Sequence, residues 1–195
     1  LMVKYERFEA IDGNNINYNI LNILKKNEYI THEHSLINFL KNKKKLAIFM
    51  SHVLLWEKLN NNTINVILED DVFIHYRFIN KLQMIWSYIP QDFDILYLGC
   101  GGKIDGIKVN EHIIKPHNKH LPHTNHGLFG YIIKTSSIQK ILQKMLPINN
   151  SNILIKGDWQ QHYSIIPHLD WKLRHFYNKG ITAYYLRKPL INHVG

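Results

Sequence analysis

The sequence predicts an α/β fold in a single domain. Two short β-rich apolar runs, at residues 63–68 and 94–98, each stop abruptly at a polar or glycine-containing turn. Segments with apolar residues three or four apart lie before, between and after these runs, and such alternation is typical of α/β proteins. The 195 residues, 45% of them hydrophobic, suffice for one domain with a full core. No internal repeat or Pro/Gly/Ser-rich linker divides the chain, so we expect one domain over residues 1–195.

The first third of the chain predicts helices. An extended piece ends at the turn Asp12-Gly13, and residues 14–27 follow with helical spacing. Residues 32–42 also suit a helix. In residues 46–59 the apolar side chains recur on one face, which predicts an amphipathic helix.

The rest of the chain alternates between strand and helix signals. The sequence predicts a buried strand at 63–68, a helix around 79–89 and a strand at 94–98 that stops at Gly99. A Gly-punctuated strand at 124–133 and a helix at 136–146, capped by Thr135 or Ser136, are predicted next. A helix that opens within 156–162 and strands at 183–186 and 189–193 complete the predicted elements. The last two suit a β-hairpin or edge strands. Because ligands bind beyond the carboxyl ends of strands in open α/β sheets, we expect a site where 63–68 and 94–98 end.

The charge balance favours an anionic partner. The chain has 24 basic and 15 acidic residues, a formal net charge of +9, and much of the excess comes from Lys41, Lys43, Lys44 and Lys45. Nucleic acid, an anionic membrane surface and a nucleotide diphosphate all suit a positive field, and a lysine cluster is equally typical of a solvated surface. No motif interleaves aromatic and basic residues, so we expect no nucleic-acid partner.

The cysteine count and the hydropathy of the sequence indicate the cellular compartment. A single cysteine, Cys100, excludes an internal disulfide and Cys-based zinc or iron–sulfur sites within one chain. No apolar stretch reaches the ~18 residues that span a bilayer, and the start of the chain lacks the apolar core of a signal peptide. We therefore expect a soluble, cytoplasmic protein, with association at a membrane surface as the alternative. No feature predicts an oligomeric state.

Three acids, Glu69-Asp70-Asp71, follow the first apolar run directly. Clustered carboxylates at a strand end are costly unless a cation offsets them, and hard oxygen ligands suit a divalent ion completed by substrate phosphates. In an extended strand Glu69 and Asp71 would point to one side and Asp70 to the other. The sequence predicts a metal site here, with a solvated turn or helix cap as the alternative.

Other candidate groups are weaker. His193, at the C-terminal strand, is a candidate third ligand for an ion bound by Glu69 and Asp71. Asp158 suits either a helix cap or a catalytic base. Several patterns argue against other chemistry: the histidines at 112, 117, 120, 123 and 126 lack the spacing of a zinc motif, Ser51-His52 lacks a nucleophile elbow, and no Walker A or G-x-G-x-x-G loop occurs.

Ordered segments along most of the chain resemble glycosyltransferase family 25, the lipopolysaccharide-type and collagen-type sugar transferases. They are RFEAIDG (7–13), MSHVLLW (50–56) with VILEDDV (66–72), DFDILYLG (92–99), and HGLFGYIIKTSSIQKIL (126–142) with GDW (157–159), and the final AYYLRKPLINHVG is similar to the family's closing strand. The resemblance implies a GT-A-like, Rossmann-like mixed sheet flanked by helices. It also implies an inverting transfer of a hexose, galactose or glucose, from a UDP-sugar with a divalent cation such as Mn²⁺.

The resemblance also implies roles for individual residues. The metal would be held by Glu69, Asp71 and His193, the donor would be bound by Asp12, Glu69, Asp70, Asn125 and His126, and Asp158 would be the catalytic base. The implied acceptor is a glycan, of lipopolysaccharide or hydroxylysine type, and residues 103–124 are the candidate acceptor loop. The alternative is a noncatalytic nucleotide- or glycan-binding domain of the same fold.

Two departures from the family pattern stand out. Family members usually begin with an extra strand that carries an Arg-containing nucleotide-binding segment, and the sequence shows none ahead of Leu1. We therefore expect either a domain without the family's first strand or a trimmed N-terminus. The segment before Ser51 is usually Gly- and Cys-containing, whereas here it reads KKLAIFM.

Overall fold

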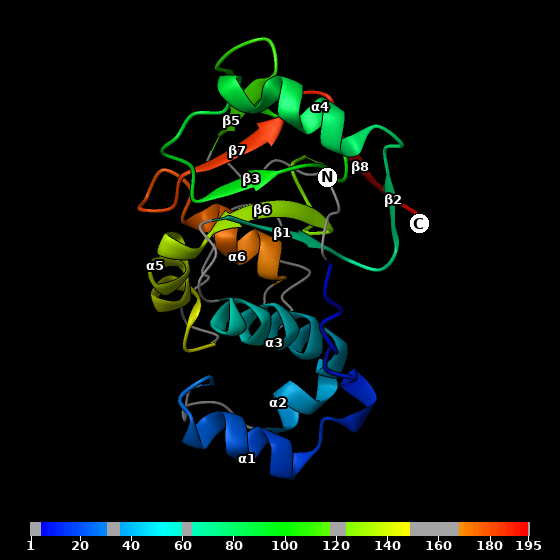
Figure 1. Cartoon of the computed structure of the whole chain (residues 1–195). Helices are drawn as coiled ribbons and strands as arrows, with labels where there is room; N and C mark the ends of the chain where they lie inside the picture. The colour runs from blue at the N-terminus through cyan, green and yellow to red at the C-terminus, as the bar shows by residue number, and fades with distance from the viewer. Residues whose placement is uncertain (1–4, 31–35, 60–63, 118–123, 149–167, 195) are drawn as a thin grey trace. The chain divides into compact units, whose positions relative to one another are not determined.

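A computed structural model of the chain describes residues 5–30, 36–59, 64–117, 124–148 and 168–194 (Figure 1). The chain divides into two compact units. The first comprises Leu1–Leu59 with Met145–Leu169, and the second comprises Asn60–Lys144 with Asp170–Gly195. That these units form one domain stays a prediction.

The first unit is helical. It contains the 3-10 turn η1 (Gly13–Asn15) and helices α1 (Tyr18–Lys26), α2 (Leu36–Lys41) and α3 (Lys43–Lys58). The Asn17 side chain caps α1 by accepting the Ile20 N–H at 3.1 Å. Buried apolar side chains of α3 form the centre of this unit, among them Phe49, Met50 and Trp56. The helices expected within 14–27 and 46–59 are confirmed, and α2 covers the described part of 32–42.

The second unit is built on a six-stranded mixed sheet with the order β1-β6-β3-β7-β5-β4 (Figure 1). Its strands are β1 (Ile64–Leu68), β3 (Ile95–Tyr97), β4 (Gly106–Lys108), β5 (Ile113–Pro116), β6 (Gly130–Lys134) and β7 (Ala183–Leu186). Strand β6 runs antiparallel to both of its neighbours, β1 and β3, whereas β3 and β7 are parallel. A separate two-stranded sheet pairs β2 (Val72–Ile74) with β8 (Ile191–His193).

Helices flank the sheet of the second unit. Side chains of α4 (Phe78–Ile85) and of the 3-10 turn η2 (Trp86–Tyr88) pack on the face that carries Leu96 and Ile132. The alternate residues of the same strands, such as Tyr97 and Tyr131, point to the other face because side chains alternate along a strand. There Tyr97 meets Tyr177, which follows α6 (Leu169–His175), and α5 (Thr135–Met145) continues from β6. The predicted α/β fold, a mixed sheet flanked by helices, is confirmed.

Several element predictions need correction. Strand β1 lies at the edge of the sheet and is only partly buried, with Val66 46% exposed, whereas the sequence predicted a buried strand. The terminal strands do not form a hairpin, because β7 lies inside the large sheet and β8 pairs with β2. The strand expected over 124–133 is confined to β6. The candidate acceptor loop contains the antiparallel pair β4 and β5. The helix expected within 156–162 lies outside the described residues.

Asp94 fixes the helix that follows β6 to the sheet. Its buried carboxylate accepts hydrogen bonds from Ser137 Oγ (2.5 Å), Lys140 Nζ (2.6 and 2.7 Å) and the Thr182 N–H (2.7 Å). Buried charges are tolerated when they are paired and fully hydrogen-bonded, as this one is. The second acid of the DFDILYLG segment therefore joins β3, α5 and the chain before β7.

Candidate functional site

Two strands end at one edge of the large sheet. Because β6 runs antiparallel to both β1 and β3, the carboxyl ends of β1 and β3 lie at the edge where β6 begins. The Glu69 N–H donates to Phe129 O (2.9 Å), and the Leu98 N–H donates to Gly130 O (2.9 Å). The sequence prediction that the runs 63–68 and 94–98 end together is confirmed.

The three acids form the turn between β1 and β2. Glu69 is half-buried at the end of β1, while Asp70 and Asp71 are exposed. The prediction that Glu69 and Asp71 point to one side of an extended strand is wrong, because β1 ends at Leu68 and the backbone turns through Asp70 and Asp71 before β2 begins. Carboxylates in such a turn keep contact with water, which lowers the cost of their mutual repulsion.

The small sheet brings His193 to this turn. Val72 is the register partner of His193, and the Val194 N–H donates to Asp71 O at 3.0 Å. As a result His193 Nε2 lies 3.0 Å from Asp71 Oδ2, and these side chains are 40% and 54% exposed. The His193 ring also packs on Phe129, with ring centroids 5.4 Å apart. Residues 122 positions apart in sequence are therefore direct neighbours.

Glycines let β8 approach the sheet edge closely. A Cβ atom at Gly99 would lie 2.1 Å from Ile191 O, and one at Gly130 would lie 2.8 Å from Ile191 Cγ2. The Leu190 N–H also donates to Leu98 O at 2.8 Å. Real side chains cannot occupy such spaces without moving the backbone, so these glycines allow β8 to pass over the ends of β3 and β6 and to carry His193 to Asp71.

Asn125 holds the loop that leads into β6. It is buried with a left-handed backbone (φ +47°), which Asn tolerates better than most residues. Its Oδ1 accepts the Asp105 N–H (2.9 Å) and its Nδ2 donates to Asp105 O (2.6 Å). Its own carbonyl accepts a bond from Tyr185 Oη (3.1 Å). The amide thus joins two loops, and its predicted part in donor binding stays a prediction.

The next two residues are held by backbone contacts. The Gly101 N–H donates to His126 O at 2.6 Å, and a Cβ at Gly101 would lie 2.4 Å from His126 Nε2. Gly127 has φ +90°, and its N–H donates to Asp170 Oδ2 at 2.8 Å. The half-buried His126 side chain therefore packs against Gly101, in the loop that precedes β6.

Helix α6 anchors this loop through two residues that the sequence analysis missed. Asp170 accepts the Gly127 N–H, and Arg174 Nη1 donates to Thr124 O at 2.8 Å. The available signal was weak: an acid in the first turn of a helix and a basic residue one turn later suit any exposed helix. Their role depends on a loop more than 40 residues away in the sequence.

Three tyrosines and Cys100 of the second unit are titratable groups that are buried or half-buried. Burial raises the pKa of Tyr97, Tyr177 and Tyr185 well above the usual value, and raises the pKa of the Cys100 thiol to about 11. Tyr97 and Tyr185 stack with ring centroids 4.3 Å apart. These groups therefore stay protonated near neutral pH, so they serve packing and hydrogen bonding.

Two predicted site residues are not among the described residues of the second unit. Asp12, in the first unit, caps η1, where its Oδ1 accepts the Asn14 N–H at 2.8 Å. Ser51 ties this segment to α3, because its hydroxyl accepts the Ile11 N–H (2.9 Å) and donates to Ala47 O (2.7 Å). Asp158, the predicted base, lies outside the described residues.

Asp71 and His193 fit a divalent cation that is bound together with a phosphate ligand. A carboxylate oxygen and an imidazole nitrogen lie side by side and are partly exposed, and both are ligand atoms that can coordinate Mn²⁺. Within the described residues, no group of three or more His, Cys, Asp and Glu side chains is placed to hold a metal by itself. A site of this kind needs further oxygens, which a diphosphate can supply.

The second unit thus has the mixed, helix-flanked sheet of a GT-A-like fold, with its acidic turn at the edge where the strands end. The chain belongs to glycosyltransferase family 25 (LPS biosynthesis protein), which residues 1–158 match. No curated protein matches the chain. Both Asp170 and His193 lie beyond the matched residues. None of the helices that the structure describes is long and apolar enough to cross a membrane.

Proposed function

We propose that this family 25 glycosyltransferase is an inverting, divalent-cation-dependent hexosyltransferase. It moves galactose or glucose from a UDP-sugar to a glycan acceptor of lipopolysaccharide or hydroxylysine type. The proposal rests above all on the 3.0 Å contact between His193 Nε2 and Asp71 Oδ2, at the edge where β1 and β3 end. A carboxylate–imidazole pair of this kind suits a cation that is bound together with a diphosphate.

The chain's own residues would bind and orient the donor. Asp71 and His193 would hold the cation, and Glu69, which the structure does not group with them, would join as a third ligand when cation and donor bind. Asp70 and His126 would contact the donor. Asn125 would also bind the donor, and the bonds of its Oδ1 and Nδ2 to Asp105 would hold its loop in place. Asp12 would lie on the nucleotide side. When bound, the cation offsets the negative charge that develops on the departing diphosphate.

Inversion needs a base on the acceptor side of the sugar. We assign this role to Asp158, where the family match ends. Its carboxylate would take the proton of the acceptor hydroxyl as that oxygen bonds to the anomeric carbon and UDP leaves. General-base catalysis of this kind contributes about 10²–10⁴-fold, so Asp158→Asn should lower turnover by that factor and spare donor binding.

A panel of UDP-sugars with Mn²⁺ tests the proposal. We expect Mn²⁺-dependent protection against unfolding and slow release of UDP from one sugar of the panel. Asp71→Asn and His193→Gln should each lower that release by at least about 100-fold, as loss of a metal-site residue does elsewhere. Glu57→Gln is the matched control, because Glu57 is an exposed acid of α3 that bonds to Tyr29 Oη and has no assigned role in the site.

The outcomes separate the two classes of function. Full activity of Asp71→Asn would refute the cation site. Binding of UDP with Mn²⁺, but no release from any sugar and no transfer to glycan acceptors, would replace the transferase with a noncatalytic nucleotide-binding domain.

A further inference from the structure

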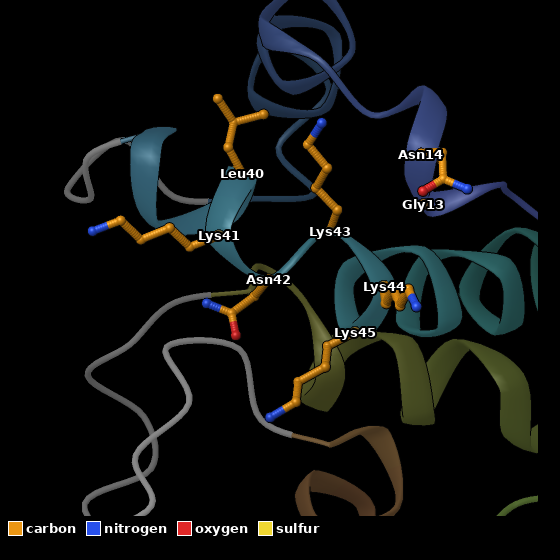
Figure 2. A pocket seen from close by; sticks show the side chains of 8 residues that line it. All are labelled: Gly13, Asn14, Leu40, Lys41, Asn42, Lys43, Lys44 and Lys45. Carbon is orange, nitrogen blue, oxygen red and sulfur yellow. The ribbon is translucent and has the colours of Figure 1, made fainter.

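A hollow of about 390 Å³ lies in the first unit, where α2 ends and α3 begins. It is lined by Gly13, Asn14, Leu40 and the run 41–45, which includes four lysines (Figure 2). We call it the lysine pocket. Figure 2 shows the four lysine side chains spread around the turn between the two helices. Lysine has a long flexible stem, so several ammonium groups can swing toward one bound anion.

The lysines of this pocket lie at the amino end of α3, where positive charge is unfavourable. The first residues of α3 are Lys43, Lys44 and Lys45, and its first turn contains no acid. The amino end of a helix carries partial positive charge and exposed N–H groups, so cations there are unfavourable and anions are favourable. Asn42, at the cap position, makes no side-chain cap hydrogen bond to these N–H groups.

Within the described residues, no acidic side chain forms an ion pair with these lysines. The nearby Asp12 carboxylate is bonded to the Asn14 N–H. Gly13 packs directly against the start of α3, because a Cβ at Gly13 would lie only 3.1 Å from Lys44 Cα. The result is an open hollow with an excess of cationic groups and, among the described parts of the chain, no acidic ion-pair partner for them.

We propose that the lysine pocket binds the phosphate group of a phosphorylated glycan. Phosphate matches the charge and offers several acceptor oxygens to the lysines and to the first N–H groups of α3. The volume suits one phosphorylated hexose, whereas a flat bilayer does not enter a hollow. Use of this glycan as the acceptor rests on the proposed function, but its binding does not.

Calorimetric titration of the full chain with glucose 6-phosphate, in low salt with a chelator present, tests the proposal. We expect glucose 6-phosphate to bind, glucose not to bind, and inorganic phosphate to bind more weakly than the sugar phosphate. The triple variant Lys43→Gln, Lys44→Gln, Lys45→Gln should weaken binding at least tenfold. The control variant Lys25→Gln, Lys26→Gln, Lys188→Gln loses the same charge outside the pocket, and should change binding less than twofold.

Other results overturn the proposal. No binding of glucose 6-phosphate, or equal weakening in both triple variants, would reduce the pocket to a solvated basic surface. Lysine-dependent binding to phosphatidylglycerol vesicles without sugar-phosphate binding would make it a membrane contact. In a separate titration without chelator, displacement of glucose 6-phosphate by UDP with Mn²⁺ would make it part of the donor site. Because the chelator removes divalent ions, Asp71→Asn should bind glucose 6-phosphate as the unaltered chain does, so failure of the proposed function remains distinguishable.

Discussion

Replacing Asp94 with alanine should destabilise the sheet unit more than replacing any exposed acid. The carboxylate accepts bonds from Ser137, Lys140 and the Thr182 N–H, and the residue is only 4% exposed. Alanine leaves the Ser137 hydroxyl and the Thr182 N–H without this acceptor. The Lys140 side chain is 45% exposed and can recover water.

The magnitude follows from these partners. Breaking a buried ion pair costs about 3–5 kcal/mol, and each buried donor left unsatisfied costs about 1–3 kcal/mol. These contributions do not add, and the exposed Lys140 recovers hydration, so we expect a loss of about 3 kcal/mol in the free energy of unfolding. In a chain of this length that loss lowers Tm by about 6–12 °C.

Urea and thermal unfolding followed by circular dichroism measure the effect. Asp92→Ala is the matched control, because Asp92 is exposed and accepts one bond, from Tyr184 Oη at 3.0 Å. We expect the control to lose about 1 kcal/mol or less. Asp94→Asn, which keeps one acceptor oxygen, should lie between them. A loss below about 1 kcal/mol for Asp94→Ala would refute the role of this carboxylate as the link between β3 and α5.

Three further results are expected. Gly99→Ala should cost at least about 1–3 kcal/mol and displace β8, because its Cβ would lie 2.1 Å from Ile191 O; unchanged thermal stability would contradict this packing. Cys100 should react with a disulfide reagent at pH 8 at least about 10-fold more slowly than in the unfolded chain, because burial raises its pKa to about 11 and lowers its thiolate fraction, a loss that the greater nucleophilicity of the thiolate only partly offsets; equal rates would contradict a buried thiol. Asp170→Ala should cost about 1–2 kcal/mol and speed hydrogen exchange of the Gly127 amide, which loses its acceptor; unchanged exchange would show that the loop is held otherwise.

Local sequence patterns predicted the parts of the fold that depend on local interactions. The spacing of apolar residues in 46–59 predicted α3, and the runs at 63–68 and 94–98 predicted β1 and β3. Short apolar runs that stop at acids or glycine also indicated the shared edge. The pairing of β8 with β2 was not predictable, because it depends on the close approach that Gly99 and Gly130 permit.

Polar residues at the site were harder to interpret. Asn125 was predicted to bind the donor; the structure adds that its amide oxygen and nitrogen both bond to Asp105, and its part in donor binding stays a prediction. The role of Asp170 was not predictable, because its partner Gly127 lies 43 positions earlier in the chain. A sequence shows which residues can form hydrogen bonds, but their partners are decided by tertiary packing. His193 was predicted as a third metal ligand because a C-terminal strand carries it; the structure places it 3.0 Å from Asp71, and its part in metal binding stays a prediction.

Binding of Mn²⁺ in the presence of UDP, followed by electron paramagnetic resonance, tests the central proposal most directly. The pair Asp71 and His193 has too few ligands to hold the ion strongly alone, so we predict weak binding of Mn²⁺ without UDP and much tighter binding with it. His193→Gln should weaken the ternary complex at least about tenfold, as loss of a group at a metal site does, and Glu57→Gln should not. Equal Mn²⁺ affinity with and without UDP, or an unchanged ternary complex in His193→Gln, would contradict the cation site.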